Sequence, residues 1–587
     1  MRAKVPAVLF VALCLLVAVP AGTGAVTAAS TAQSATTPGP ASGPADADPA
    51  AGVAGDGQAT ESPPPDPDED VLGWENGRWY NESVDVNASD GLDRNESARL
   101  LNRTMARVEL VRGVEFEEPV DLNFRTRSEV ASLFGGNVSQ YVSPQGLNAK
   151  YEALGFAGED RDAVDVLREK QGGSTAAFVA NAEIPELDIQ PGDVTIVLDD
   201  GQTTFSEVTL AHELVHTLQV QELAFPYRTN VSAIGSTDSF NARRSVVEGE
   251  ASHAGYLYAQ RCDGEWDCVT PQPGGGPGLS DAARALLFMD FVRYGNGGEF
   301  VAELREAGGW DAVVDTYDDL PASTEQVIHP EKYRADQPEA VTVPDRSGEA
   351  WRPLPEAADT VGEAGLFTML WFPGFVSRST VVMEPFAGIN RSVRSQFVVD
   401  YDHEATAGWD GDRLVPYVSD SADANETGFV WRTEWDSAAD AAEFRDAYLS
   451  LLSYRGADAV DGRQNTYRIP DDSPFGDAFY VVQNGSSVLV VNGPTVADLS
   501  AVHEGAAPEA ATATPTPTPT PTATAAPTTT SAPTSTPTAT ATDAPTATTA
   551  GETTARETTA GSGPGVGALG ALVAVLTGVA LVVRRRR

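Results

Sequence analysis

Residues 209–221, TLAHELVHTLQVQ, carry the pattern that decides the fold we expect. Two of the six histidines in this 587-residue chain stand here, four positions apart, and a glutamate directly follows the first of them. On a helix, positions i and i+4 lie on one face, so His212 and His216 can offer ring nitrogens to a single metal ion. The pattern therefore predicts a helix that carries a metal site, with Glu213 beside the open coordination position.

The chemistry expected of such a helix is metal-assisted hydrolysis. Zinc held by three protein ligands keeps one position open and lowers the pKa of a water there to about 7. Glu213 can take a proton from that water and pass it to a leaving amine. The alternative is an amphipathic helix with two incidental histidines. We favour the metal site, because a chance match in a chain with so few histidines is expected on the order of once in a few hundred such chains.

A third ligand is expected within residues 245–258, SVVEGEASHAGYLY, which also have helical spacing. Glu248 and Glu250 compete for the role, and on a helix they point about 200° apart, so only one of them can face the metal. Val247 and Ala251 mark a buried side next to Glu248. Because a ligand belongs on the buried side, Glu248 is the expected ligand, and Glu250 lies behind it or faces solvent.

Together the two segments resemble the gluzincin metallopeptidases, whose third zinc ligand is a glutamate on a later helix. The resemblance implies an α+β fold with a zincin-like catalytic domain, zinc as the cofactor, a peptide or protein substrate, and the ligands His212, His216 and Glu248. In thermolysin-type gluzincins, an acidic residue four positions after the ligand glutamate orients a zinc histidine. Here Ser252 stands at that position. Glu250, Ser252 or a backbone carbonyl would therefore have to fix the histidine tautomer.

A further segment, residues 308–333 (GGWDAVVDTYDDLPASTEQVIHPEKY), is similar to one found in bacterial and haloarchaeal zincin-like surface proteins. It supplies two more candidate catalytic residues. His329 precedes a proline, which favours an extended or turn conformation. From such a position His329 or Tyr333 could donate a hydrogen bond to the oxyanion that forms during peptide hydrolysis. The alternative is a turn with a purely structural role.

The charge of the chain indicates its solvent more than its substrate. There are 84 acidic against 39 basic side chains, a formal charge of −45, and the lysines are Lys4, Lys150, Lys170 and Lys332. Phosphate contacts would have to form against repulsion, which argues against nucleic acid and anionic lipid as partners. In molar salt the Debye length falls to about 3 Å, so like charges on such a surface hardly repel one another. The composition resembles that of halophilic archaeal proteins.

Both ends of the chain indicate export and anchoring. Residues 1–25 combine basic residues, an apolar run and small residues, as secretory signals do. Residues 566–583 form an uncharged apolar run of sufficient length to span a bilayer, and four arginines follow it. This tail resembles the PGF-CTERM sorting signal of haloarchaeal surface proteins, although Val566 stands where that pattern has phenylalanine. The resemblance implies an archaeosortase that removes the helix; a plain membrane anchor is the alternative.

Composition divides the rest of the chain. Low-complexity segments on both sides lack the large apolar residues that a core needs, and the body between them is too long for one ordinary core. We expect a signal peptide (1–25), a disordered acidic arm (26–70), a zincin-like domain (71–340), a connecting segment (341–389), a small α+β domain (390–505), a Thr/Pro-rich stalk (506–562) and a sorting or transmembrane tail (563–587). The small domain is expected to serve as a structural or partner-binding module.

Two kinds of covalent modification are expected of an exported chain. Cys262 and Cys268 enclose a short loop, which predicts a disulfide, with a pair of free thiols as the alternative. Asn-x-Ser/Thr sequons predict N-glycosylation at Asn81, Asn87, Asn95, Asn102, Asn137, Asn230, Asn390, Asn425 and Asn484.

Two functions from different classes fit these observations. The first is a zinc metalloendopeptidase anchored at the cell surface, which cleaves extracellular peptides or surface proteins. The second is a non-catalytic surface glycoprotein with a role in adhesion or the cell envelope, whose zincin domain is vestigial. Metal analysis of the purified protein in high salt, together with cleavage of a general peptide library, separates them.

Overall fold

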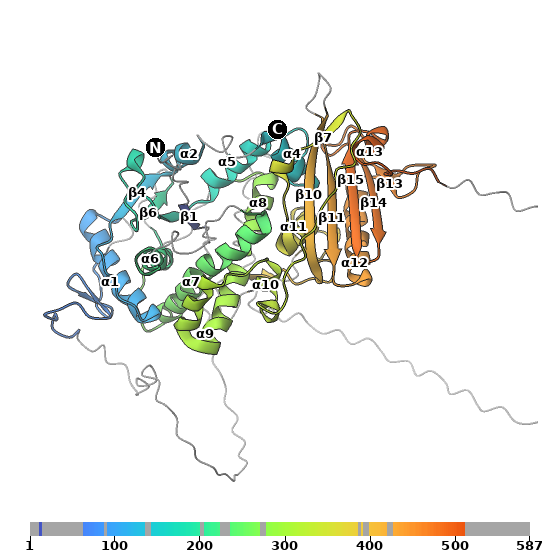
Figure 1. Ribbon diagram of the computed structural model, residues 1–587. Helices are drawn as coiled ribbons and strands as arrows, with labels where there is room; N and C mark the ends of the chain where they lie inside the picture. The colour runs from blue at the N-terminus through green and yellow to red at the C-terminus, as the bar shows by residue number, and fades with distance from the viewer. Residues whose placement is uncertain are drawn as a thin grey trace, which may run out of the picture.

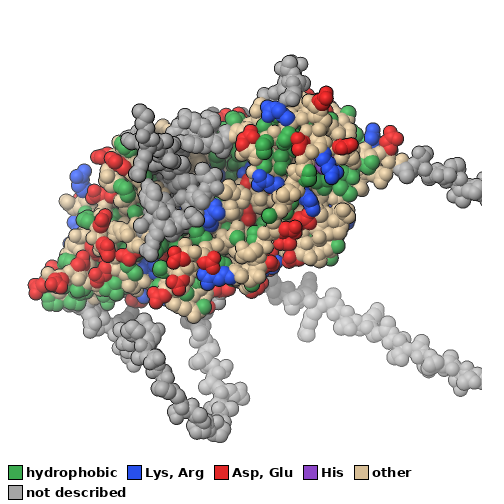
Figure 2. All heavy atoms as spheres, viewed as in Figure 1, with side chains coloured by type: hydrophobic (Ala, Val, Ile, Leu, Met, Phe, Trp, Pro, Cys, Tyr) green, Lys and Arg blue, Asp and Glu red, His purple; other side chains and the backbone are tan. Residues whose placement is uncertain are grey.

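The computed structural model describes residues 11–14, 63–86, 91–135, 143–199, 205–223, 235–270, 278–385, 389–390, 398–419 and 426–510. The fold is α+β, as the sequence predicts. Most helices and a small sheet gather on one side of the molecule, and a large antiparallel sheet forms the other side (Figure 1). Acidic side chains are spread over the viewed face of both parts (Figure 2).

The small sheet has the strand order β1-β5-β6-β4. β4 (Leu122–Thr126) runs parallel to β6 (Val194–Leu198), while β5 (Ala177–Ala180) is antiparallel to β6. The edge strand β1 (Val11–Cys14) pairs with β5 and comes from the segment predicted to be a signal peptide. β5 is buried along its whole length, so the sheet contributes to the core on which the neighbouring helices pack.

Three long helices build the part of the molecule that carries the histidine motif. α1 (Arg94–Arg112) begins at a capping box. The side chain of Asp93 accepts hydrogen bonds from the backbone of the first helical turn, and the side chain of Glu96 accepts one from the backbone N–H of Asp93. Such a box stabilises the start of a helix. α6 (Glu207–Glu222) contains the motif and is buried over most of its length. α7 (Thr237–Cys262) carries the second glutamate-rich segment. α1, α6, α7 and the small sheet share one hydrophobic core.

The remaining helices surround these elements. α9 (Gly295–Asp315) packs along α7 and is broken at Gly308 and Gly309, where the backbone leaves helical geometry. The shorter helices are α2 (Arg127–Gly135), α4 (Pro144–Ala153), α5 (Ala163–Ser174), α8 (Asp281–Phe291) and α10 (Glu325–Ile328), with 3-10 turns η1 (Pro185–Leu187), η3 (Thr316–Asp318), η4 (Pro330–Lys332) and η5 (Pro355–Ala357).

The large sheet is antiparallel throughout and has the order β12-β13-β14-β15-β11-β10-β7. Its strands are β7 (Trp351–Pro353), β10 (Trp409–Ser419), β11 (Thr427–Trp435), β12 (Asp458–Ala459), β13 (Thr466–Arg468), β14 (Ala478–Asn484) and β15 (Ser487–Gly493). α12 (Ala438–Tyr454) and α13 (Val496–Val502) contact the sheet. Two small hairpins, β2 (Trp74–Glu75) with β3 (Arg78–Trp79) and β8 (Ile389–Asn390) with β9 (Val398–Val399), complete the described strands.

The segment 341–389, expected to be a connection, holds an element of the core. α11 (Gly362–Ser377) is buried along nearly its whole length despite the internal Pro373. Its aromatic side chains join one hydrophobic cluster that also includes residues of α4, α5, α8, α12 and the large sheet. One core therefore extends from residue 147 to residue 490, across the expected domain seam.

Several predicted features lie wholly or mainly outside the described residues. These are the acidic arm up to residue 62, the stalk from 511 onward, the tail 563–587, and the sequons at Asn87, Asn137, Asn230 and Asn425. Among the described residues, no helix has the length and apolar character needed to cross a membrane. Of the described sequons, Asn95 and Asn484 are exposed, whereas Asn81 and Asn102 are half-buried.

Candidate metal centre

α6 and α7 bring three potential metal ligands together. His212 and His216 lie one helical turn apart on α6, and α7 supplies Glu248 opposite them. Glu248 Oε2 is 3.2 Å from His216 Nε2 and 3.6 Å from His212 Nε2. The ligand atoms of the three residues all lie within 4.8 Å of one another. The structure thus places all three sequence-predicted ligands in one group.

Glycine at position 249 allows the close helix packing beside this group. A Cβ atom on Gly249 would lie 2.2 Å from the carbonyl oxygen of Gly297 on α9, and one on Gly297 would lie 2.5 Å from the carbonyl oxygen of Ser245 on α7. Real Cβ atoms do not approach so closely, so neither position tolerates a side chain without movement of backbone. The glycine that follows Glu248 in the sequence is therefore explained by the contact between α7 and α9.

The three residues are buried, and their converging atoms contact one another but no other group. His212, His216 and Glu248 are 7%, 2% and 1% exposed. Among the described residues, no hydrogen-bond partner outside these three reaches His212 Nε2, His216 Nε2 or Glu248 Oε2. Buried polar atoms are normally satisfied, because leaving one bare costs about 1–3 kcal/mol. Two imidazole nitrogens and one carboxylate oxygen form a donor set of zinc hydrolases, so these residues fit a zinc ion.

A glutamine behind His216 fixes the tautomer that a metal requires. His216 Nδ1 is 2.8 Å from Gln219 Oε1. The amide nitrogen of Gln219 donates to Glu250 Oε2 at 2.9 Å and to the carbonyl of Val247 at 3.0 Å, which orients the amide. Because Gln219 Oε1 accepts, the proton of His216 lies on Nδ1, and the lone pair of Nε2 points into the group. Gln219 therefore has the role of fixing the histidine tautomer, for which the sequence offered Glu250, Ser252 or a backbone carbonyl.

Glu250 lies behind the group and does not compete with Glu248. Its Oε2 accepts from Gln219 and, at 2.5 Å, from the hydroxyl of Tyr317, while Oε1 pairs with Arg112 at 2.5 Å. The Arg112 guanidinium in turn lies 4.0 Å from the ring centre of Trp310. Glu250 is the buried anchor of a network that ends on His216.

Arg244 binds Oε1 of Glu248, the oxygen that does not face the histidines. It lies one turn before Glu248 on α7 and donates to Glu248 Oε1 at 2.5 Å, so that Oε2 faces the histidines. Burial alone would raise the pKa of Glu248, but His216 and Arg244 together lower it well below its ordinary value. Burial lowers the pKa of His212, while at His216 the carboxylate of Glu248 outweighs burial and raises the pKa. The carboxylate is therefore held in its charged form, as a metal ligand must be.

Glu213 and Tyr294 complete the surroundings of the histidines. Glu213 directly follows His212 on α6 and is fully buried. The ring of Tyr294 is stacked with that of His212, with their centres 6.3 Å apart. Sequence reasoning missed Tyr294 and Arg244. Gln219 stands inside the quoted motif, three positions after His216, so helical spacing was a signal that could have found it.

The two other candidate catalytic residues make their contacts elsewhere. His329 Nε2 lies 3.1 Å from Glu363 Oε1 on α11, and the hydroxyl of Tyr333 donates to the carbonyl of Asp319 at 2.5 Å. The Tyr333 ring packs edge-on against Phe300. The structure therefore gives the expectation of an oxyanion donor no support: both side chains are engaged in contacts that hold the 316–333 segment. The backbone at His329 has φ −117° and ψ 82°, which is neither helical nor a regular extended conformation.

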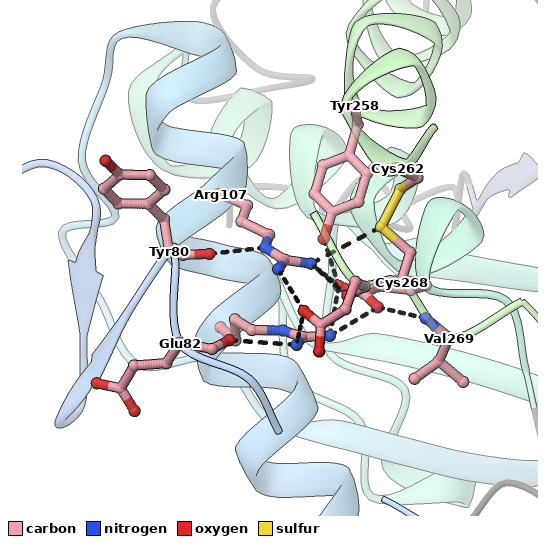
Figure 3. The surroundings of a disulfide bond; sticks show 10 residues. Tyr80, Glu82, Arg107, Tyr258, Cys262, Cys268 and Val269 are labelled. Atoms are coloured by element: carbon pink, nitrogen blue, oxygen red, sulfur yellow. Dashed lines mark hydrogen bonds and ion pairs between the residues drawn. A yellow bond between two sulfur atoms is a disulfide. The ribbon is translucent and has the colours of Figure 1, made fainter. Parts of the chain in front are cut away.

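The predicted disulfide is formed, and the loop that it closes lies beside the start of α6. Cys262 at the end of α7 is bonded to Cys268 (Figure 3). Arg107 and Tyr258 lie beside the bond, and Val269 follows it. The carboxylate of Glu207, the first residue of α6, accepts hydrogen bonds from Tyr258 at 2.6 Å and from the backbone of Val269 at 2.8 Å. The disulfide loop is thus tied to the beginning of α6.

Two buried arginines of α1 complete this junction. Arg103 and Arg107 are each 1% exposed, and both pair with the fully buried carboxylate of Glu207, at 3.0 and 2.8 Å. They also pair with Asp267 inside the disulfide loop. Such a junction fixes where α6 starts and therefore where its histidines lie relative to α7.

Comparison with known proteins concerns the other side of the molecule. Residues 352–503 match a family described as a domain of unknown function (DUF8575). The match includes α11 and most of the large sheet, and it leaves out α6 and α7. No curated protein and no solved structure matches the chain.

Proposed function

We propose that this protein is a zinc-dependent metalloendopeptidase of the gluzincin type, with a zincin-like domain within residues 71–340. The proposal rests on one observation. Three buried potential ligand atoms from two helices converge with no hydrogen bond to any described group outside the three, and a buried glutamate directly follows the first histidine. His212, His216 and Glu248 would hold the zinc.

The proposed reaction is hydrolysis of a peptide bond. Zinc, when bound, supplies the Lewis acidity that makes a water molecule a nucleophile near neutral pH. Glu213 takes the proton of the attacking water and delivers it to the nitrogen of the leaving amine. Arg244 binds one oxygen of Glu248, and Gln219 binds the ring of His216. Both proposed ligands are therefore already oriented in the metal-free protein.

Other features of the chain support a role outside the cell, at its surface. The disulfide between Cys262 and Cys268 is of a kind that persists in oxidising compartments. The apolar run 566–583 and the Thr/Pro-rich stalk before it support attachment to a membrane, either directly or after an archaeosortase has exchanged the helix for a lipid. The proposed substrates are accordingly extracellular peptides or surface proteins. We also propose that the protein is glycosylated.

The decisive experiment separates metal binding from cleavage. The exported protein and its Glu213→Gln variant are purified in molar salt, and both are analysed for zinc and incubated with a general peptide library. We expect about one zinc per chain in both proteins, and cleavage reduced by at least about 100-fold in the variant, since general acid–base catalysis contributes 10²–10⁴-fold. Glu222→Gln, an exposed change on the same helix, should leave both readings unchanged.

Three results would contradict the proposal in different ways. Equal cleavage by wild type and Glu213→Gln would remove the mechanism. A wild-type protein without zinc would remove the metal site. A wild-type protein that binds zinc and cleaves no peptide in the library would favour the second function, a surface glycoprotein with a role in adhesion or the cell envelope.

A further inference from the structure

A second group of metal-ligating side chains lies far from the histidines in sequence. Glu152 is near the end of α4, Glu159 lies in the loop after it, and Asp477 directly precedes β14. A carboxylate oxygen of each residue lies within 4.8 Å of one from both others. More than 300 residues separate Asp477 from Glu152 and Glu159, so tertiary packing alone brings them together.

The backbone holds the two segments against each other at this point. The amide of Glu159 donates to the carbonyl of Pro474 at 2.9 Å. A Cβ atom on Gly158 would lie 2.2 Å from the same carbonyl, so only glycine permits the approach. The three carboxylates are therefore neighbours because of how their loops pack, and they cannot separate without breaking that contact.

Two members of the group have oxygen atoms that no residue outside the group reaches. Asp477 is 1% exposed; its Oδ2 accepts from the amide of Asn492 at 2.8 Å, and no described residue outside the group reaches its Oδ1. The same holds for Oε1 of the half-buried Glu152. The carboxyl groups of Glu152 and Asp477 lie within hydrogen-bonding reach of each other, so a proton or a cation must stand between them. An ionised carboxylate oxygen in such a place is normally hydrogen-bonded or bound to a cation.

The nearby arginines favour the charged forms of Glu152 and Asp477 from a distance, but their hydrogen bonds go to other groups. Arg455 donates to the carbonyl of Gly155 at 2.7 Å and lies over the ring of Phe475. Arg468 donates to the carbonyl of Gly476 and pairs with Asp471. Among the ion pairs of the described residues, none joins either arginine to Glu152, Glu159 or Asp477. Burial raises the pKa of Glu152 well above its usual value and that of Asp477 to about 6, with added repulsion from neighbouring carboxylates.

In a second cluster of three acidic side chains, a lysine balances the negative charge. Glu325, Asp336 and Asp436 also bring three carboxylates together. There, Lys332 pairs with all three, at 2.5, 3.6 and 3.1 Å, so its ammonium supplies the positive charge. The group at Asp477 has no such side chain within its described ion pairs.

We propose that Glu152, Glu159 and Asp477 bind a divalent cation of the calcium type. Carboxylate oxygens without nitrogen or sulfur donors suit a hard cation, and three flexible carboxylates meet the irregular geometry that calcium accepts. The exposed position of Glu159 gives the ion access from solvent. The bound ion ties the loop after α4 to the turn before β14, and so joins the helical part to the region matched by the domain family. This site is independent of the proposed zinc chemistry.

The test uses the full exported protein, loaded with zinc and purified in molar sodium chloride. Calcium binding is measured by equilibrium dialysis, and thermal unfolding is followed in calcium and in EGTA. We expect about one calcium ion per chain with a Kd of roughly 10⁻⁴–10⁻³ M, and a melting temperature higher by a few degrees in calcium. Glu159→Gln should weaken calcium binding by roughly tenfold or more, because one charged ligand is lost.

The variants make the outcome decisive. Glu159 is exposed, so Glu159→Gln should fold and should melt in EGTA no lower than wild type. Asp336→Asn, which changes the lysine-filled cluster by the same charge, should bind calcium as wild type does. The proposal is overturned if wild type binds no calcium, or if Glu159→Gln binds it with unchanged affinity. Zinc content is measured in every sample, so a failure of the zinc site is seen separately.

Discussion

The amide oxygen of Gln219 lies 2.8 Å from Nδ1 of His216, on the side of the ring away from the other ligands. Two residues of α7 orient that amide, because its nitrogen donates to the carboxylate of Glu250 and to the carbonyl of Val247. The ring of a ligand on one helix is thus fixed by contacts with the next helix. A metal site built in this way depends on residues that touch no metal.

Loss of the Gln219 amide should therefore weaken zinc binding. In Gln219→Leu, His216 Nδ1 loses its acceptor and the ring loses the contact that selects its tautomer. We expect zinc affinity to fall by roughly 10–100-fold, as for other partners of metal-ligating histidines. Competition with a chromophoric chelator measures the change. Gln221→Leu, a change on the same helix that leaves His216 untouched, is the control; equal zinc affinity in the two variants would show that Gln219 does not position the ligand.

The sequence could point to His212, His216 and Glu248 as candidate ligands because helical spacing is a local relation. The spacing of His212 and His216 follows from helical geometry alone, and the buried side of the second helix distinguishes Glu248 from Glu250. The structure places these ligands as the spacing suggests. Tyr294 comes from a segment outside both helices, so spacing does not contain its contact with His212. Arg244 lies one turn before Glu248 on α7, so helical spacing was a signal that could have found it.

The same reasoning explains what sequence spacing could not supply for His329 and for the segment 341–389. His329 was considered for catalysis because its backbone before a proline could be predicted, but its partner Glu363 comes from α11, 34 positions later. α11 itself was interpreted as part of a connection. Its glycines and Pro373 disfavour a helix locally, whereas burial on nearly all sides stabilises one. Tertiary packing decided both cases.

The two glutamates of α7 should behave differently when replaced. Glu248→Ala should lose zinc, because Oε2 of Glu248 is the third atom of the proposed ligand set. Glu250→Gln should retain zinc but lower the free energy of unfolding by roughly 3 kcal/mol, since the buried Arg112 would lose its charged partner. Elemental analysis and thermal unfolding measure the two effects. If Glu250→Ala loses the metal while Glu248→Ala retains it, the assignment of the ligand is wrong.

Titration of Asp238, near the start of α7, should make the free energy of unfolding depend on pH. This residue is 2% exposed, and its Oδ1 accepts hydrogen bonds from the backbone and the hydroxyl of Thr324. Burial raises its pKa from 3.8 to about 7, and the nearby carboxylates of Asp412 and Asp359 add to the rise. The folded protein therefore keeps a proton that the unfolded chain releases between these two values. Its contribution to stability is complete below about pH 3.8 and is lost as the pH rises to about 7.

Asp238→Asn should remove this dependence, because an amide oxygen can still accept from Thr324 and carries no charge at any pH. We expect wild type to lose stability relative to the variant between pH 4.5 and 7.5, by at most about 4 kcal/mol over the full interval. Thermal unfolding at constant salt across that range measures the difference. Asp281→Asn changes an exposed aspartate in the first turn of α8 and should follow the wild-type slope. A variant at Asp238 whose stability falls in parallel with wild type would show that this carboxyl does not titrate on folding, and the pH dependence would have to come from the other buried carboxyls.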